Sequence, residues 1–551
     1  MTLPGLAAAR GLEPADAVFT GAEVFNPFSS TFECADFAVK DGYIIGLGDY
    51  EGKKEHDLSG TYVVPGLIDA HVHIESSLLA PAEYARVVLT HGTTTVIADP
   101  HEIANVCGVA GIEYMLAGGA RTPLDILIML PSCVPATPHD MGGARLTAAD
   151  LARFRGRERV IGLAEVMNVP GVLTGDEDLR AKMDLFEVID GHAPSLSGKD
   201  LNAYIHAGVQ SDHESTTLSE ALEKLLRGMY VMIREGSTEQ NLRDLLPLVN
   251  RCTAPRCCFA TDDRHAGTLV RDGHIDDCIR KATTYGLEVE LALRMATLSA
   301  AERFRLHDRG AIAPGRLGDF CVIDDPDRFC VLRTFKRGVE VIDRGYRPPE
   351  VPVAPMHARV PVQDEIRITG AGEARVIGVV PGHITTRDLR CPVDAAAIPD
   401  TGRDILKAVV TDRYRGRGSG VGLVHGLGLQ EGAIAGSVSH DSHNIVAVGV
   451  DDRDIIRAIA EVVRLGGGLV AVSGNEVTTL PLECAGLMSA RPYDEVLRRL
   501  AAVEAHAGEL GAIENPFMYL SFLALTVIPE LRVTERGVFD VGAFSDVPLF
   551  C

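Results

Sequence analysis

Eight short apolar segments, separated by helix-like stretches and each followed by polar residues, constrain the fold of this chain most strongly. They are GLIDAHVH (66–73), TTTVIADP (93–100), ILIMLPSC (126–133), RVIGLAEVM (159–167), LFEVIDGHAP (185–194), AGVQSDHE (207–214), MYVMIREGS (229–237) and CCFATDDRH (257–265). Apolar runs of this length are typical of buried parallel strands. Eight strand–helix units in roughly 240 residues match a (β/α)8 barrel. We therefore expect an α/β fold with a TIM-like barrel over residues 66–305.

The segments on either side of the barrel predict two further domains. Residues 1–65 and 306–350 contain short alternating runs broken by Gly and Asn, and we expect them to form one small β-sandwich. A Pro-rich stretch at 346–362 is typical of a linker. Residues 363–551 have mixed character with one strong helix, VDDRDIIRAIAEVVRLGGG, and predict an additional C-terminal α/β domain.

Charge and cysteine usage exclude several classes of function. The chain has 551 residues, of which 53 are Lys or Arg and 76 are Asp or Glu, giving a net charge of −23. Nucleic-acid binding requires clustered basic residues, so we expect no nucleic-acid partner. Twelve Cys without a C-x-x-C pair indicate reduced thiols. The most apolar stretch, 516–529, is too short to span a bilayer, and no secretory signal is read. We therefore expect a cytoplasmic protein that does not bind membranes.

The pair His71 and His73 is the strongest indication of chemistry. Residues i and i+2 of a strand point to the same face, so both imidazoles can enter one barrel mouth. A single His would more often be structural, but two on one face at the carboxyl end of the first barrel strand indicate a metal site. The other strand ends carry similar groups: Asp99-Pro100-His101-Glu102, Glu165, His192, Asp212-His213-Glu214, Arg234-Glu235 and Thr261-Asp262-Asp263-Arg264-His265.

Catalytic groups of barrel enzymes come from the carboxyl ends of several strands, which fits this distribution. Imidazole and carboxylate without thiolate suit a divalent metal such as Mn, Fe or Zn. A carboxylate shared by two cations can hold them close together, and their charge lowers the pKa of bound water toward neutrality.

Several long motifs resemble the adenine deaminases of the amidohydrolase superfamily. These motifs are DPHEIANVCG (99–108), GLAEVMNVPGV (162–172), GHAP-SLSGKDLNAY (191–204), SDHE (211–214), FATDDRH (259–265) and VSHDSHNI (438–445). The resemblance runs from residue 16 to the end of the chain. It implies hydrolytic deamination of adenine to hypoxanthine and ammonia by a metal-activated hydroxide, within purine salvage.

The resemblance also implies a set of site residues and two metal ions per subunit, Mn or Fe with Zn as an alternative. The implied metal ligands are His71, His73, Asp99, Glu165, His192, His213 and Asp262. The resemblance implies Asp262 as catalytic proton shuttle and places His101, a further catalytic candidate, in the polar motif near the second metal; Glu235, at the end of the seventh strand, is our candidate donor to N1 of adenine. For Glu235, an ion pair with Arg234 or another basic neighbour is an equal alternative.

Three questions stay open at the level of sequence. A cyclic-amide hydrolase of the dihydropyrimidinase or dihydroorotase type shares the metal frame, although such enzymes usually carry Lys where this chain has Glu165. A non-catalytic scaffold is disfavoured because every expected ligand position is filled. His440 and His443 either face the active site or satisfy a Gly-rich turn. Barrels of this size are commonly symmetric, so we expect a homo-oligomer, a dimer or larger.

Overall fold

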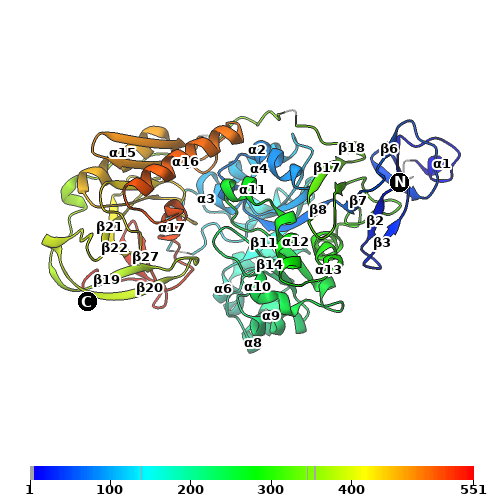
Figure 1. The fold of residues 1–551 in the computed structure, drawn as a ribbon. Helices are drawn as coiled ribbons and strands as arrows, with labels where there is room; N and C mark the ends of the chain where they lie inside the picture. Colours follow the sequence, from blue (N-terminus) through cyan, green and yellow to red (C-terminus); the bar gives the residue numbers. More distant parts are fainter. Residues whose placement is uncertain (1–4, 138, 344, 353–354) are drawn as a thin grey trace.

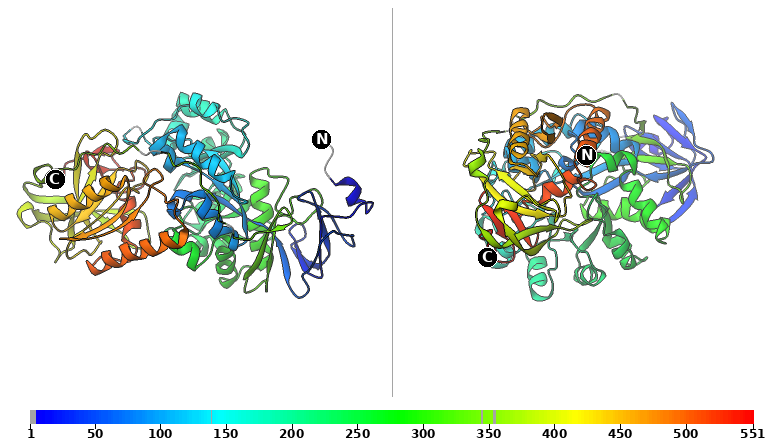
Figure 2. Two further views of the ribbon diagram at one scale, coloured as in Figure 1. Left: turned by 90° about the horizontal axis from the view of Figure 1, so that it is seen from above. Right: turned by 60° about the vertical axis from the view of Figure 1, so that its left-hand side comes forward.

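The computed structural model describes residues 5–137, 139–343, 345–352 and 355–551. Three bodies follow one another across the molecule (Figure 1): the N-terminal strands lie at one end, the barrel in the middle and the C-terminal domain at the other end. The turned views keep this order, with the C-terminal domain against the barrel on the side away from the N-terminal strands (Figure 2).

The eight expected barrel segments are all strands, and they follow one another in chain order. They are β8 (Leu67–Val72), β9 (Thr93–Ala98), β10 (Asp125–Leu130), β11 (Val160–Val166), β12 (Ile189–Gly191), β13 (Ser211–Asp212), β14 (Tyr230–Arg234) and β15 (Cys257–Ala260). Strands β8 to β12 form one parallel sheet and β13 to β15 another. A parallel bridge between Val72 and Asp262 joins the first strand to the last, and Gln210 donates its N–H to Ile189 O at the other junction. These contacts are consistent with the expected TIM-like barrel.

Helices follow the barrel strands, most of them on the outside of the barrel and α3 at its mouth. They are α2 (Pro81–Thr90), α3 (His101–Cys107), α4 (Val109–Gly119), α5 (Ala148–Ala152), α6 (Val169–Thr174), α7 (Glu177–Met183), α8 (Gly198–His206), α9 (Leu218–Leu226), α10 (Leu242–Leu245), α11 (Ala266–Arg271), α12 (Ile275–Thr284), α13 (Val289–Arg294) and α14 (Ala300–Arg303). Every residue of β8, β9 and β10 is buried, as expected for strands with a packed interior on one face and helices on the other. Within the described part of the chain, no helix is long and apolar enough to cross a membrane.

The strands outside the barrel form two N-terminal sheets. One has the order β5-β4-β1-β6 and the other β18-β17-β16-β7-β2-β3. Their bounds are β1 (Ala17–Thr20), β2 (Glu23–Asn26), β3 (Thr31–Cys34), β4 (Phe37–Lys40), β5 (Tyr43–Leu47), β6 (Glu55–Asp57), β7 (Tyr62–Pro65), β16 (Phe320–Ile323), β17 (Val331–Lys336) and β18 (Val339–Glu340). Antiparallel pairing of β7 with β16 joins chain from before and after the barrel. Phe19, Phe37, Phe320 and Phe335 pack together between the sheets.

The C-terminal domain is built on one eight-stranded sheet of order β20-β19-β22-β21-β24-β23-β25-β26. Its strands are β19 (Ala371–Val379), β20 (Thr386–Asp394), β21 (Ile405–Thr411), β22 (Ser419–His425), β23 (Ala433–Gly436), β24 (Ile445–Gly449), β25 (Gly468–Ser473) and β26 (Glu476–Pro481). Neighbouring strands are antiparallel except β19 and β22. The expected strong helix is α15 (Asp452–Leu465), which begins after the capping side chain of Asp451 and ends at Gly466 in the left-handed region.

Three further elements complete this domain: α16 (Tyr493–Glu509), α17 (Pro516–Phe522) and a small sheet of β27 (Leu531–Thr534), β28 (Gly537–Asp540) and β29 (Ser545–Asp546). The domain thus combines helices with a largely antiparallel sheet, which explains the mixture of helix-like and strand-like segments in its sequence. The described residues of the Pro-rich stretch 346–362 form no helix or strand.

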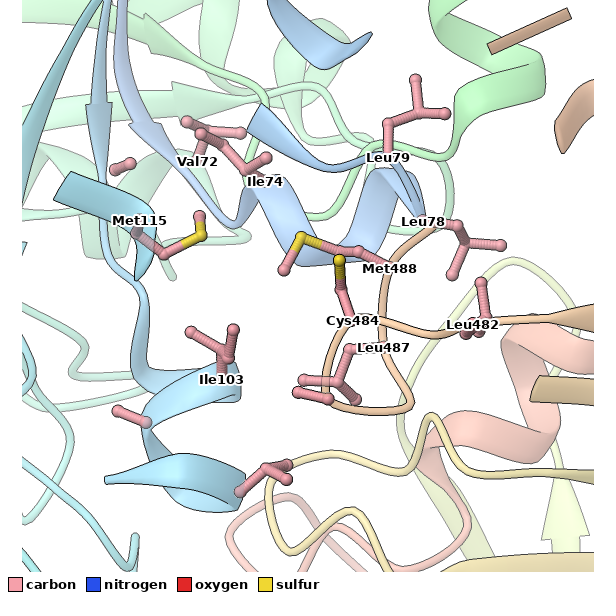
Figure 3. Close-up of a cluster of buried hydrophobic side chains, with 14 of the residues drawn as sticks. Val72, Ile74, Leu78, Leu79, Ile103, Met115, Leu482, Cys484, Leu487 and Met488 are labelled. Atoms are coloured by element: carbon pink, nitrogen blue, oxygen red, sulfur yellow. The ribbon is translucent and has the colours of Figure 1, made fainter. Parts of the chain in front are cut away.

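An apolar seam joins the C-terminal domain to the barrel mouth. Figure 3 shows Leu482, Cys484, Leu487 and Met488 of one C-terminal loop facing side chains of the first barrel unit and of α3 and α4. Backbone hydrogen bonds between Ser489 and the 78–80 segment fix the loop in place. Because Val72 belongs to this seam and precedes His73, the C-terminal domain lies directly beside the end of the first barrel strand.

Candidate active site

A cavity at the carboxyl ends of the barrel strands is closed on its other side by the C-terminal domain. Its barrel lining consists of His73, His101, Glu102, Glu165, Met167, His192, His213, Glu214, Arg234, Asp262 and Asp263. Its C-terminal lining consists of Ile384, His440, Asp441, Phe522, Leu525, Val527 and Ile528. One wall is therefore mostly charged or polar and the other mostly apolar.

His71 and His73 direct the same ring nitrogen into the site. The Nδ1 of His73 lies 3.0 Å from the backbone oxygen of Asp99, which can only accept, so Nδ1 carries the proton in the neutral ring. The Nδ1 of His71 lies 3.2 Å from a carboxylate oxygen of Asp190, which orients that ring in the same way. The two Nε2 atoms are only 3.1 Å apart. Two facing lone pairs at this distance require a proton or a cation between them.

Glu165 touches two groups of imidazoles, one with each carboxylate oxygen. Its Oε1 lies 3.2 Å from His73 Nε2 and 3.3 Å from His101 Nδ1. Its Oε2 lies 2.8 Å from His192 Nδ1 and 3.2 Å from His213 Nε2. This side chain, at the end of β11, contacts both groups within 3.3 Å. Its position is that of a bridging group between two adjacent ion sites.

Asp262 is a buried carboxylate held between imidazoles and a guanidinium. Its Oδ1 lies 3.6 Å from His71 Nε2 and 3.2 Å from His73 Nε2, while Arg234 donates to Oδ2 at 2.8 Å. Burial opposes ionisation, but Arg234 and the two imidazoles hold the pKa of Asp262 well below its usual range. Arg234 also donates to Glu214, whose Oε1 is 3.7 Å from His192 Nδ1.

The chemistry of these donors fits divalent ions. Ligand atoms roughly 2.0–2.2 Å from one ion lie roughly 3 Å apart, as the Nε2 and carboxylate atoms do here. Burial lowers the pKa of His71, yet the neighbouring carboxylates of Asp190 and Asp262 raise that pKa to about 10. Glu214 and Glu165 likewise overcome burial and raise the pKa of His192 to about 9. The surrounding carboxylates thus stabilise positive charge at the imidazole nitrogens. A divalent ion bound there would supply this charge.

The structure brings most of the predicted site residues together. His71, His73, Asp99, His101, Glu165, His192, His213 and Asp262 fall in overlapping groups of potential ligand atoms. Within these groups, Asp99 accepts from His101 Nδ1 at 2.9 Å through one oxygen, while its other oxygen is buried without a partner.

Glu235 is the exception. Alternation along β14 turns Arg234 into the cavity and the next residue out of it, toward α12. Lys281 donates to Glu235 Oε1 at 2.8 Å. Glu235 therefore forms the ion pair that was the alternative to a catalytic role, and its partner is Lys281 rather than Arg234.

The C-terminal domain contributes residues whose role the sequence left open. His440 and His443 both contact the carboxylate of Glu102, one at each oxygen. Phe522 stacks on His440 with ring centroids 4.6 Å apart. The apolar 516–529 stretch, which is too short to span a bilayer, supplies four of the lining residues. Arg532 is fully buried and donates to the backbone oxygens of Phe522, Ile528 and Ile384, which fixes this apolar wall.

Comparisons with known proteins agree with this two-part cavity. The amidohydrolase family model matches residues 62–341, and the adenine deaminase C-terminal domain model matches residues 383–545. Adenine deaminase of Methanoculleus marisnigri is 82% identical over 515 residues, covering 94% of this chain and 99% of the relative. Adenine deaminase of Methanoregula boonei is 59% identical and covers 98% of each chain. The chain belongs to the adenine deaminase family. Membership of the amidohydrolase family implies the use of divalent metal ions, in keeping with the His and carboxylate groups at the strand ends.

Three residues that contact the candidate ligands of this adenine deaminase family member were not identified as site residues from the sequence. They are Asp190, Glu214 and Arg234. Asp190 orients His71, and a lone Asp inside the apolar run LFEVIDG was the available signal. Glu214 was noted at a strand end without a role, and Arg234 was noted only as a possible ion-pair partner of Glu235. The apolar wall carried no signal, because a run such as PFMYLSFLALTVIP looks the same in a core and in a substrate pocket.

Proposed function

We propose that this chain catalyses the hydrolytic deamination of adenine to hypoxanthine and ammonia. The observation that carries the proposal is the shared carboxylate of Glu165 between two imidazole groups, in a chain that matches adenine deaminases over almost its whole length. Replacement of the amino group at C6 of adenine by oxygen consumes one water molecule and releases one molecule of ammonia.

Two divalent ions, Mn or Fe with Zn as an alternative, are proposed to bind on either side of Glu165. His71, His73 and Asp262 would hold one ion, His192 and His213 would hold the other, and Glu165 would contribute to both. Asp99 is proposed to stay near the first group as the orienting partner of His101. The charge of such ions lowers the pKa of water toward neutrality, which makes a nucleophile available at neutral pH.

Asp262 is proposed to move the proton that the water loses. It is ionised because Arg234 stabilises its charge, and its Oδ1 faces the same point as the two Nε2 atoms. From this position the carboxylate accepts a proton from water and returns it to the departing amino group. General acid–base catalysis of this kind contributes typically about 10²–10⁴ in rate.

Glu214, rather than Glu235, is proposed to pass a proton to N1 of the ring as C6 becomes tetrahedral and to take back the proton of the new C6 hydroxyl as ammonia leaves. Glu214 lines the cavity beside His192 and is anchored by Arg234. His101 is proposed to position groups rather than to exchange protons with substrate, since both of its ring nitrogens face carboxylates.

The apolar wall is proposed to bind the faces of the planar purine. Ile384, Leu525 and Ile528 stand opposite the charged strand ends, and Phe522 stacks on His440. Pockets for small ligands are mostly apolar with a few placed polar groups, which is the division seen across this cavity.

The chain as a whole is proposed to divide into residues 1–65 with 306–350, 66–305 and 363–551. Support comes from the β7–β16 pairing and from the lack of helix or strand in the described part of 346–362. A homo-oligomer in the cytoplasm stays a prediction.

A substrate panel tests the proposed activity. The Mn-loaded chain should release ammonia and hypoxanthine from adenine and much less ammonia from adenosine or cytosine. Opening of a dihydropyrimidine ring without deamination of adenine would favour the cyclic-amide hydrolase instead.

A further inference from the structure

Three buried side chains converge where the barrel meets the C-terminal domain, beside the two groups that share Glu165. His101 Nε2 lies 3.3 Å from Glu102 Oε1 and 3.7 Å from Asp441 Oδ1. All three residues are more than nine-tenths buried. We propose that they form a third divalent-cation site, separate from the two proposed ions of the deamination reaction.

The orientation of His101 supports a cation at its Nε2. Its Nδ1 lies 2.9 Å from Asp99 Oδ2, so Nδ1 donates its proton to that carboxylate. The lone pair of Nε2 then points toward Glu102 and Asp441. A carboxylate that accepts from one ring nitrogen while the other faces a metal is a common arrangement around metal-bound histidines.

Asp441 supplies a second, independent sign of a missing partner. Its Oδ2 is buried and has no hydrogen-bond partner, although a buried carboxylate oxygen without a partner is costly. Within the described part of the chain, every basic group in ion-pair range of Glu102 or Asp441 is an imidazole; no Lys or Arg reaches them. A divalent ion would satisfy the free oxygen and balance the two carboxylates.

His443 orients Glu102 and is not itself a ligand. The backbone N–H of Ser439 donates to His443 Nδ1 at 3.1 Å, so the proton of the neutral ring sits on Nε2. That Nε2 donates to Glu102 Oε2, which leaves Oε1 to face His101 and His440. One imidazole nitrogen and two carboxylates, completed by water, suit Mn²⁺ or a similar ion.

Such an ion would tie the two halves of the cavity together. His101 and Glu102 belong to α3 of the barrel, whereas Asp441 belongs to the C-terminal loop that also carries His440. Because Phe522 stacks on His440, the ion would fix both the loop and one side of the apolar wall. The proposal concerns cation binding alone and does not depend on the identity of the substrate.

Metal counting on the full chain tests the site. Metal-stripped protein is loaded with Mn²⁺, freed of unbound ion and analysed for Mn per chain. Wild type should hold three equivalents, whereas Asp441→Asn, which removes the charge and keeps the shape, should hold two. The matched control is Asp140→Asn: Asp140 lies near Asp441, but its oxygens are bonded to Thr137 and Thr526, so this variant should keep three.

Two results would overturn the site. If wild type binds no more than two Mn²⁺ per chain, there is no third site. If folded Asp441→Asn still binds three Mn²⁺ per chain, the third ion does not bind at Asp441. If that variant fails to fold, Glu102→Gln is used and should lose the same equivalent. Ammonia release from adenine is measured separately, so three Mn²⁺ in a chain that does not deaminate adenine would reject the activity and leave the site standing.

Discussion

The two walls of the cavity differ in composition and in origin. The barrel wall is built from ionisable side chains at seven strand ends, whereas the C-terminal wall is mostly Ile384, Phe522, Leu525, Val527 and Ile528. Groups that hold ions and move protons require fixed positions, and strand ends of a barrel provide them. Apolar groups that cover a planar ring require only shape and burial. From this contrast we propose that the barrel performs the chemistry and that the C-terminal domain encloses the substrate.

The largest effect is expected for the bridging group. Glu165→Gln keeps the shape of the side chain but removes the charge shared by both proposed ion sites. Bound Mn should fall below two equivalents, and turnover should fall by roughly 10³ or more. Glu187→Gln, at an exposed carboxylate, is the control. Full metal occupancy together with full turnover would show that Glu165 does not bridge.

Asp262→Asn should separate metal binding from proton transfer. The amide cannot accept the proton of water, so kcat should fall at least about a hundredfold while most of the metal stays bound. Metal content must be measured on the same sample. If the loss of rate simply follows a loss of metal, Asp262 is a ligand without the proposed shuttle role.

The pH dependence of metal binding should be set by histidines of the barrel wall. Without metal, the raised pKa values of His71 and His192, about 10 and about 9, keep both rings protonated at neutral pH. Metal binding must then release protons. The affinity for the metal should therefore fall as the pH drops below about 9, by about tenfold per pH unit for each proton released. Titration calorimetry in buffers of different ionisation enthalpy measures the released protons, and zero release at pH 7 would contradict this electrostatic account.

The apolar wall should affect binding more than turnover. Phe522→Leu keeps an apolar side chain but removes the ring that stacks on His440. We expect KM for adenine to rise by about tenfold, with kcat changed less than about twofold. Phe28→Leu in the N-terminal domain, where the side chain is exposed, is the matched control.

The smallest effect is expected for Glu235. Its carboxylate pairs with Lys281 outside the cavity, so Glu235→Gln should change turnover less than about threefold. The same change at Glu214 should lower turnover at least about a hundredfold if Glu214 serves N1. Equal losses at both positions would remove the distinction between them.

Most of the barrel wall could be predicted from the sequence, and the C-terminal wall could not. His71 and His73 lie at the end of a periodic apolar run, so their direction follows from strand geometry. For Glu235 the direction of the side chain depends on the exact residue at which β14 ends. An error of one residue turns the side chain from outside the cavity to inside it. His440 reaches Glu102 across more than three hundred residues, a contact that only tertiary packing determines.

The division of labour between the walls is tested most directly by one kinetic comparison. Asp262→Asn and Phe522→Leu are loaded to the same Mn content, and kcat and KM for adenine are measured side by side. The account predicts that the first variant loses kcat with KM little changed, and that the second raises KM with kcat retained. A kcat for Phe522→Leu as low as that of Asp262→Asn, or a near-normal kcat for Asp262→Asn, would contradict it.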